Sequence, residues 1–155
     1  MTFQIRQDEL DSPQTKALLA LHLVGMHENS PPEAVFALDL SGLQQPGITV
    51  WSAWQGEKIA GIGALKILGL HHAEVKSMRT HPDFLRRGVA GLLLAHIIHM
   101  ARVKGVARLS LETGCGPAFE PALALYRRQG FLNGPVFADY QPSPFSQFLH
   151  LDLAS

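Results

Sequence analysis

Between residues 73 and 113 the hydrophobic period changes twice, and this change constrains the fold more than any other feature. Residues 73–80 carry the β-formers of a strand, and apolar side chains recur at helical spacing from about Pro82 until Gly105. Residues 106–113 again have the pattern of a strand. A strand, a helix and a strand in this order form a right-handed unit with parallel strands. We therefore expect two parallel strands covered by a long helix.

The segments on either side of this unit predict a mixed α/β domain. Strand patterns precede and follow it, and the turn residues at 55–57 indicate a hairpin. Residues 30–33, SPPE, have the pattern of a capping box that would start a helix. No repeat or linker interrupts the chain, so we expect residues 1–155 to form one domain. The further elements that we expect are strands at 2–7, 48–54, 58–68, 131–138 and 145–153, and helices at 13–26, 35–43 and 121–129.

The composition excludes several classes of protein. The chain of 155 residues has 13 Lys and Arg against 13 Asp and Glu, so its zero net charge gives no general reason to bind nucleic acid or an anionic membrane. No apolar run approaches the ~18 residues of a membrane span, and the N-terminus lacks the pattern of a signal peptide. The single cysteine, Cys115, permits no internal disulfide. We expect a soluble, cytoplasmic protein without a nucleic-acid or membrane partner.

The eight histidines do not have the spacing of a metal site. His96 and His99 lie three residues apart on the expected long helix, and His71 and His72 are adjacent. No third ligand stands at a recognisable spacing from either pair, and the sequence HExxH does not occur. We therefore expect no metal, and we interpret His96 and His99 as polar or partly buried helix residues.

The loop that enters the long helix is rich in arginine and glycine, with the sequence RRGVAG at 86–91. A helix N-terminus presents unpaired N–H groups, small residues let a phosphate approach them, and arginine adds positive charge. The spacing alone fits an anion site and a plain solvent-exposed helix start equally well. The loop is not a Walker A motif, because the sequence G-x-x-x-x-G-K-[ST] does not occur. The GIG sequence at 61–63 lies in a strand pattern and indicates close packing or a bulge.

In these features the chain resembles the GNAT superfamily of acyl-CoA-dependent N-acetyltransferases. The resemblance rests on the 86–91 loop, on the order of elements, and on the sequence LYRRQGF at 125–131. Gly88 and Ala90 match the family's [Q/R]-x-x-G-x-[G/A] string, whose first position is Leu85 in this chain. The SPPE stretch and the ALDL stretch after it resemble a subgroup of small bacterial acetyltransferases. The resemblance implies a mixed, mostly antiparallel sheet of about seven strands with a central parallel pair, together with four helices.

The resemblance also implies how acetyl-CoA would bind as a co-substrate. The strand that ends at Met78, Arg79 and Thr80 would hydrogen-bond the pantetheine arm, in the gap where it diverges from the next parallel strand. The N–H at or near Met78 would polarise the thioester carbonyl. The pyrophosphate would be held by the backbone amides of Arg86, Arg87, Gly88, Val89, Ala90 and Gly91.

Two catalytic residues follow from the resemblance. Tyr126 stands where the family places the tyrosine that protonates the departing thiolate, although from the residues alone a core tyrosine is the alternative. Glu74 stands where several members have the general base, and the residues alone fit equally well an exposed strand glutamate paired with Lys76. We expect direct transfer within a ternary complex, without a covalent acyl-enzyme.

The acceptor is expected to be a primary amine of a small molecule or a peptide. In the family its pocket comes from the first two helices and the loop before the last strand. Glu33 also fits the capping box with Ser30, which is its alternative role. The candidate acceptor-side residues are His22, His27, Glu33 and Tyr140.

Two departures from the family pattern keep other functions open. Leu85 replaces the usual Gln or Arg, and Phe119 stands where many members have asparagine. The alternative is a non-catalytic acyl-CoA-binding or regulatory module on the same fold, and a third hypothesis is an unrelated enzyme for a phosphate ligand. Exposed strands near the C-terminus would also support a homodimer.

Overall fold

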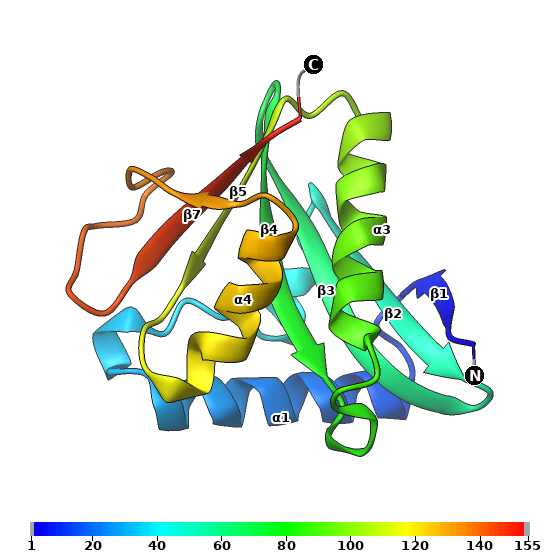
Figure 1. Ribbon diagram of the computed structural model, residues 1–155. Helices are drawn as coiled ribbons and strands as arrows, with labels where there is room; N and C mark the ends of the chain where they lie inside the picture. The colour runs from blue at the N-terminus through cyan, green and yellow to red at the C-terminus, as the bar shows by residue number, and fades with distance from the viewer. Residues whose placement is uncertain (1, 154–155) are drawn as a thin grey trace.

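The computed structural model describes residues 2–153, whose strands form one seven-stranded sheet (Figure 1). The strand order is β1-β2-β3-β4-β5-β7-β6, and of these neighbours only β4 and β5 run parallel. This confirms the expected mixed, mostly antiparallel sheet with a central parallel pair. The strands are β1 Gln4–Gln7, β2 Ile48–Gln55, β3 Lys58–Gly69, β4 His72–Thr80, β5 Arg108–Thr113, β6 Leu132–Asn133 and β7 Gln147–Asp152.

Helices cover both faces of this sheet (Figure 1). α1 and α2 share an apolar core with one face, and α3 and α4 share a larger core with the other. Within residues 2–153 no helix is both long enough and apolar enough to cross a membrane. The helices are α1 Pro13–Asn29, α2 Leu40–Leu43, α3 Val89–Val103 and α4 Glu120–Arg128, and three short 3₁₀ turns lie at Pro32–Ala34 (η1), Pro82–Phe84 (η2) and Pro117–Phe119 (η3).

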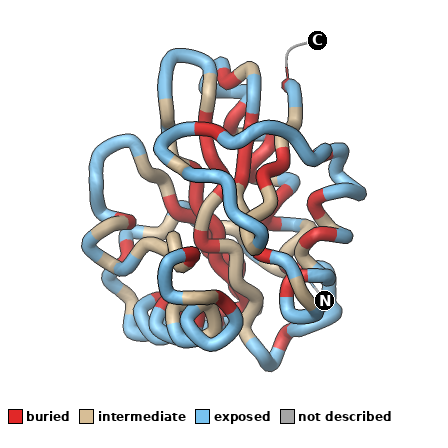
Figure 2. The backbone as a smooth tube through the Cα atoms, turned by 90° about the vertical axis from the view of Figure 1, so that its left-hand side faces the viewer, coloured by how far each residue is buried: buried red, intermediate tan, exposed pale blue. Residues whose placement is uncertain are grey.

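Apolar side chains of the strands and helices form the two cores. Leu93 and Ile97 of α3 and Leu109 of β5 belong to the larger core, and each is 0% exposed. Full burial of such a side chain contributes about 1.5–3 kcal/mol. Leu18 of α1 and Ile62 of β3 belong to the second core. Figure 2 shows buried segments concentrated inside the molecule and exposed loops around them.

Gly61 and Gly63 of β3 let α3 lie close to the sheet. A Cβ atom at Gly61 would stand 2.7 Å from Cγ1 of Val89. A Cβ atom at Gly63 would stand 2.6 Å from Sδ of Met78 and 2.9 Å from Cδ1 of Ile97. Interiors are close-packed, so neither position admits a side chain without movement of its neighbours. Close packing therefore accounts for the GIG sequence.

The helix expected at 35–43 does not form, and that prediction was wrong. The chain makes the turn η1, continues in an irregular segment, and forms only the single helical turn α2. Asp39 starts α2, because its carboxylate accepts a hydrogen bond from the N–H of Gly42 at 2.8 Å. The capping box was also wrong: Ser30 is the C-terminal cap of α1, and its hydroxyl has no hydrogen-bond partner among the described residues.

Two other boundaries differ from the expected ones. α3 begins at Val89 and not near Pro82, because η2 is a separate turn and Gly88 has a left-handed φ of 79°. The strand expected at 131–138 contains only the two residues of β6. Pro135 follows soon after and has no N–H to donate to a strand ladder. The chain then returns as β7, which lies between β5 and β6.

The parallel strands β4 and β5 pair only over their first residues and then diverge. Their register joins His72–Glu74 to Arg108–Ser110 and extends no further. On its other side β4 has a bulge, since Ser77 and Met78 together stand opposite Gly63. Ser77 has a left-handed φ of 58° at this point. A bulge takes backbone groups out of the ladder and bends the strand, so β4 leaves the sheet plane where the gap opens.

Candidate functional site

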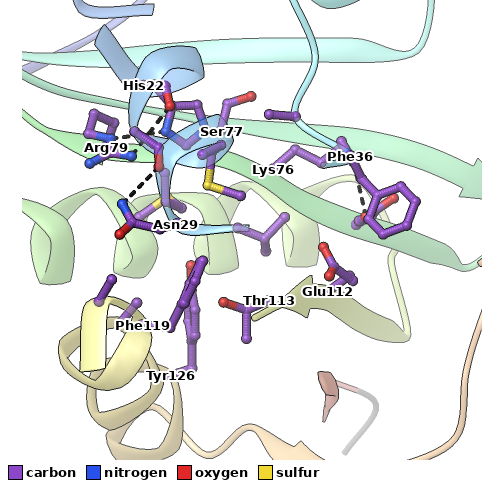
Figure 3. Close-up of a pocket in the computed structure, with 18 residues that line it drawn as sticks. His22, Asn29, Phe36, Lys76, Ser77, Arg79, Glu112, Thr113, Phe119 and Tyr126 are labelled. Atoms are coloured by element: carbon purple, nitrogen blue, oxygen red, sulfur yellow. Dashed lines mark hydrogen bonds and ion pairs between the residues drawn. The ribbon is translucent and has the colours of Figure 1, made fainter. Parts of the chain in front are cut away.

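The diverging strands border a pocket of about 180 Å³ (Figure 3). Residues of α1 and the irregular segment after η1 line one side, and residues of η3 and α4 line the other. Apolar walls come from Met26, Phe36 and Phe119. The polar side chains that the pocket brings together are His22, Asn29, Glu74, Lys76, Ser77, Arg79, Glu112, Thr113 and Tyr126.

Tyr126 points from α4 into the pocket with its hydroxyl (Figure 3). Its ring belongs to the larger core and meets Phe131 edge-to-face at 5.8 Å between ring centroids. Burial, followed by the negative charge of Glu112, raises the pKa of Tyr126 to about 12. This pKa keeps the hydroxyl protonated at neutral pH. Because the hydroxyl makes no hydrogen bond to another described residue, it is free to donate one to a ligand.

Glu112, near the end of β5, is a candidate that the sequence analysis missed. Its side chain lines the pocket next to Thr113 (Figure 3). Burial raises the pKa of Glu112 to about 7, so the carboxyl exchanges its proton near neutral pH. The signal that points to it is positional. Ligands of open α/β sheets bind outside the carboxyl ends of the parallel strands, and Glu112 lies close to that end of β5.

Glu74 belongs to a buried cluster with Lys76 and Tyr140. Its carboxylate accepts hydrogen bonds from the Tyr140 hydroxyl and from Nζ of Lys76, the latter at 3.3 Å. Nζ of Lys76 also donates to the Tyr140 oxygen at 2.9 Å. Burial, then the charge of Glu74, raises the pKa of Tyr140 above its usual range. The pairing of Glu74 with Lys76 is thus present, but it is buried and not exposed. Tyr140 donates a hydrogen bond to Glu74 but does not itself line the pocket.

Arg79 extends from β4 to α1. Its Nε donates to Nδ1 of His22 at 3.0 Å, and its Nη2 donates to the His22 carbonyl at 3.5 Å. Burial, followed by the positive charges of Arg79 and Lys76, lowers the pKa of His22 to about 4. His22 is therefore neutral and can accept the bond. The Arg79 side chain contributes to the α1 wall of the pocket, while its backbone lies beside the bulge.

The N-terminus of α3 presents a run of unpaired amides. The N–H groups of residues 86–91 make no hydrogen bond within the described part of the chain, and the first turn of α3 has no acidic side chain. Arg86 and Gly88 have left-handed φ values of 63° and 79°, and Arg86 and Arg87 are exposed. A Cβ atom at Gly91 would stand 3.7 Å from Leu125 of α4, so this end of α3 adjoins the helix that carries Tyr126. Positive charge and free amides together favour an anion.

Of the remaining predicted residues, Met78 lines the pocket, whereas His27, Glu33 and Thr80 do not. His27 is exposed on α1 and lines neither pocket described here. Glu33 is exposed along a second groove, which is bordered by residues 141–145. The Met78 side chain packs toward α3, so this residue contributes its backbone at the bulge. Thr80 ends β4, and it is half-buried.

The pocket combines three groups that acyl transfer requires. A carboxyl with a pKa near 7 can take a proton from an attacking nucleophile. A protonated phenol can donate to a leaving group, and backbone N–H groups at a bulge can stabilise a developing oxyanion. The amides of α3 supply a place for an anionic handle on the substrate.

The chain is similar to known N-acetyltransferases. Residues 11–131 match the model of the acetyltransferase (GNAT) family. The chain is 50% identical to the uncharacterized N-acetyltransferase YedL of Escherichia coli K12 over 97% of this chain and 95% of the relative. It is 49% identical to the uncharacterized N-acetyltransferase YsnE of Bacillus subtilis 168 over 94% and 96% of the two chains.

Solved structures share the fold over nearly the whole length. A Klebsiella pneumoniae protein assigned as an acyl-CoA N-acyltransferase superposes with a TM-score of 0.83 at 27% identity, covering 99% of both chains. A Bacillus subtilis acetyltransferase solved in complex with CoA has a TM-score of 0.74 at 19% identity, and the match covers 99% of this chain and 100% of that one.

Proposed function

The chain belongs to the acetyltransferase (GNAT) family and is an N-acetyltransferase, and from this premise we propose how its pocket transfers an acetyl group from acetyl-CoA to a primary amine. The amine and the thioester meet in the gap between β4 and β5, in one ternary complex. No side chain forms a covalent bond to the acetyl group.

Acetyl-CoA supplies the activated acetyl group, and this chain's backbone holds it at two places. The free amides of residues 86–91, with the exposed Arg86 and Arg87, bind the pyrophosphate at the N-terminus of α3. The backbone of Met78 to Thr80 binds the pantetheine arm. The N–H at the bulge near Met78 stabilises the negative charge that develops on the thioester oxygen.

Glu112 and Tyr126 move the two protons of the reaction. Glu112 accepts the proton that the amine loses as its nitrogen forms a bond to the carbonyl carbon. Tyr126 donates its proton to the sulfur as the carbon–sulfur bond breaks, and solvent restores both residues to their starting states. We assign the base to Glu112 in preference to Glu74, because the Glu74 carboxylate already accepts bonds from Tyr140 and Lys76.

The observation that carries this proposal is the presence of Glu112 and Tyr126 in one pocket, with pKa values of about 7 and about 12. We expect Glu112→Gln to lower kcat/KM by about 10²- to 10⁴-fold, the usual contribution of general base catalysis. We expect Tyr126→Phe to lower kcat while acetyl-CoA affinity stays nearly unchanged. Release of free thiol from acetyl-CoA, measured over a panel of primary amines, gives the rates, and calorimetry gives the affinity.

Two matched variants make the experiment decisive. Glu120→Gln removes an exposed carboxylate of α4 and should leave the rate unchanged. Glu74→Gln tests the other buried carboxyl of the pocket. A larger loss in Glu74→Gln than in Glu112→Gln would transfer the role of base to Glu74. Tight acetyl-CoA binding without turnover of any amine would instead favour the non-catalytic module.

A further inference from the structure

The Arg79 guanidinium has no acidic partner in the described structure. Its two hydrogen bonds both go to His22, which is neutral. The ion pairs among residues 2–153 join Lys76 to Glu74, His81 to Asp83 and Arg108 to Asp152, and none includes Arg79. Burial lowers the pKa of Arg79 below its usual value. The guanidinium is half-buried and has no counterion, so an anionic partner from outside the chain would compensate for the hydration that it has lost.

Two residues of α1, His22 and Gly25, contact this guanidinium. A Cβ atom at Gly25 would stand 2.9 Å from Nη2 of Arg79, so glycine at this position leaves room for the guanidinium where it now lies. Glycine destabilises the interior of a helix, and Gly25 lies within α1. His22, one turn earlier, fixes the orientation of the guanidinium through its Nδ1 atom.

A second unpartnered polar group lies next to Arg79 along β4. Ser77 lines the pocket and is 8% exposed, and its hydroxyl, which is buried, has no hydrogen-bond partner in the described structure. Figure 3 shows Ser77 and Arg79 on the same side of the pocket as His22. Lys76 is neutralised by Glu74, so Arg79 is the cation of the pocket that lacks a compensating charge within residues 2–153. Apolar side chains complete this part of the wall: Met26, Phe36 and Phe119.

We propose that Arg79 binds a carboxylate of the acceptor, which makes the acceptor an amino acid or another small amine that carries a carboxylate and an apolar body. This inference rests on the proposed function, because it concerns the substrate of the same pocket. A guanidinium and a carboxylate form paired, charge-assisted hydrogen bonds. Polyamines are disfavoured, since they would leave Arg79 unpaired and add like charge.

The test uses products, so that binding is measured without turnover. N-acetyl derivatives of alanine, methionine and phenylalanine are each compared with the acetamide of the same amine without its carboxylate. Calorimetry on the CoA complex of the wild-type chain should give at least tenfold tighter binding for the acid of at least one pair. Arg79→Gln should abolish this preference. Arg6→Gln removes an exposed arginine of β1 and should keep the preference.

Two further variants guard against a loss that reflects misfolding. Arg79→Lys keeps the charge without the planar fork and should retain only part of the preference. Gly25→Ala leaves Arg79 in the sequence but crowds its guanidinium, so it should also reduce acid binding. The inference is overturned if no acid binds more tightly than its partner, or if Arg79→Gln keeps the preference.

Acetylation of the matching free amines separates this inference from the proposed function. Acids that bind through Arg79 while no amine is acetylated would leave the inference standing and refute the transfer reaction. Amines that are acetylated equally well with and without a carboxylate would keep the reaction and refute the inference.

Discussion

At the scale of single residues, one β-bulge decides which side chains form the pocket. Side chains of a regular strand alternate between faces, so Met78 would follow Glu74 and Lys76 onto the α1 face. The extra residue at the bulge reverses this alternation: Met78 packs toward α3, and Arg79 reaches His22 on α1. The GIG sequence at 61–63 indicated close packing or a bulge, but it did not indicate which side chains of β4 change face, so the contact of Arg79 with α1 could not be predicted.

The pKa of a single residue, Glu112, determines how the rate of acetyl transfer should depend on pH. Glu112 must be unprotonated to act as a base, and burial raises its pKa to about 7. We therefore expect kcat/KM to rise more steeply with pH below about 7 than above it, where only deprotonation of the amine itself still increases the rate. A pH–rate profile of Glu112→Gln should lack this change of slope. A wild-type profile without any inflection between pH 6 and 8 would contradict the assignment.

At the scale of elements, the strong hydrophobic periods were predicted well and the short elements were not. α3 and the strands around it follow from their apolar patterns, because burial against the sheet enforces those patterns. The expected helix at 35–43 failed because Asp39 caps a later start and the preceding segment is irregular. Motif resemblance singled out Tyr126 and the loop at 86–91 as candidates, since both depend on local sequence. Glu112 could not be found in this way, because its place in the pocket depends on where β4 and β5 diverge.

Packing of α3 on β3 gives a prediction about stability. Gly61→Ala would place a Cβ atom 2.7 Å from Val89 at the start of α3 and 3.1 Å from the backbone oxygen of Arg79. We expect a loss of about 1–3 kcal/mol in the free energy of unfolding, as for other overpacked sites. Gly69→Ala is the matched control on β3, because no atom lies within 4 Å of its added Cβ. Urea unfolding measures both, and equal midpoints would contradict this account of the packing.

At the scale of the whole molecule, His22 and Glu112 titrate in opposite senses when the chain unfolds. Burial lowers the pKa of His22 from 6.5 to about 4 and raises the pKa of Glu112 from 4.5 to about 7. Stability from neutral His22 is present above pH 6.5 and is lost as pH falls toward 4. Stability from protonated Glu112 is present below pH 4.5 and is lost as pH rises toward 7. Between pH 4.5 and 6.5 the folded chain holds one proton on this pair, on Glu112, and the unfolded chain also holds one, on His22. The pair therefore does not make the free energy of unfolding change with pH in this range.

Replacing either residue should leave the other to make the free energy of unfolding depend on pH. In Glu112→Gln only His22 titrates, the unfolded chain binds the additional proton, and stability should rise with pH by up to about 1.4 kcal/mol per pH unit relative to wild type. In His22→Asn the folded chain binds the additional proton on Glu112, so stability should fall with pH by a similar amount, while asparagine still offers Arg79 an acceptor. Urea unfolding between pH 4.5 and 6.5 measures both slopes. Slopes of the same sign would contradict the opposed pKa shifts, whereas opposite slopes would show that the pocket keeps its proton count constant on folding by burying one acid and one base together.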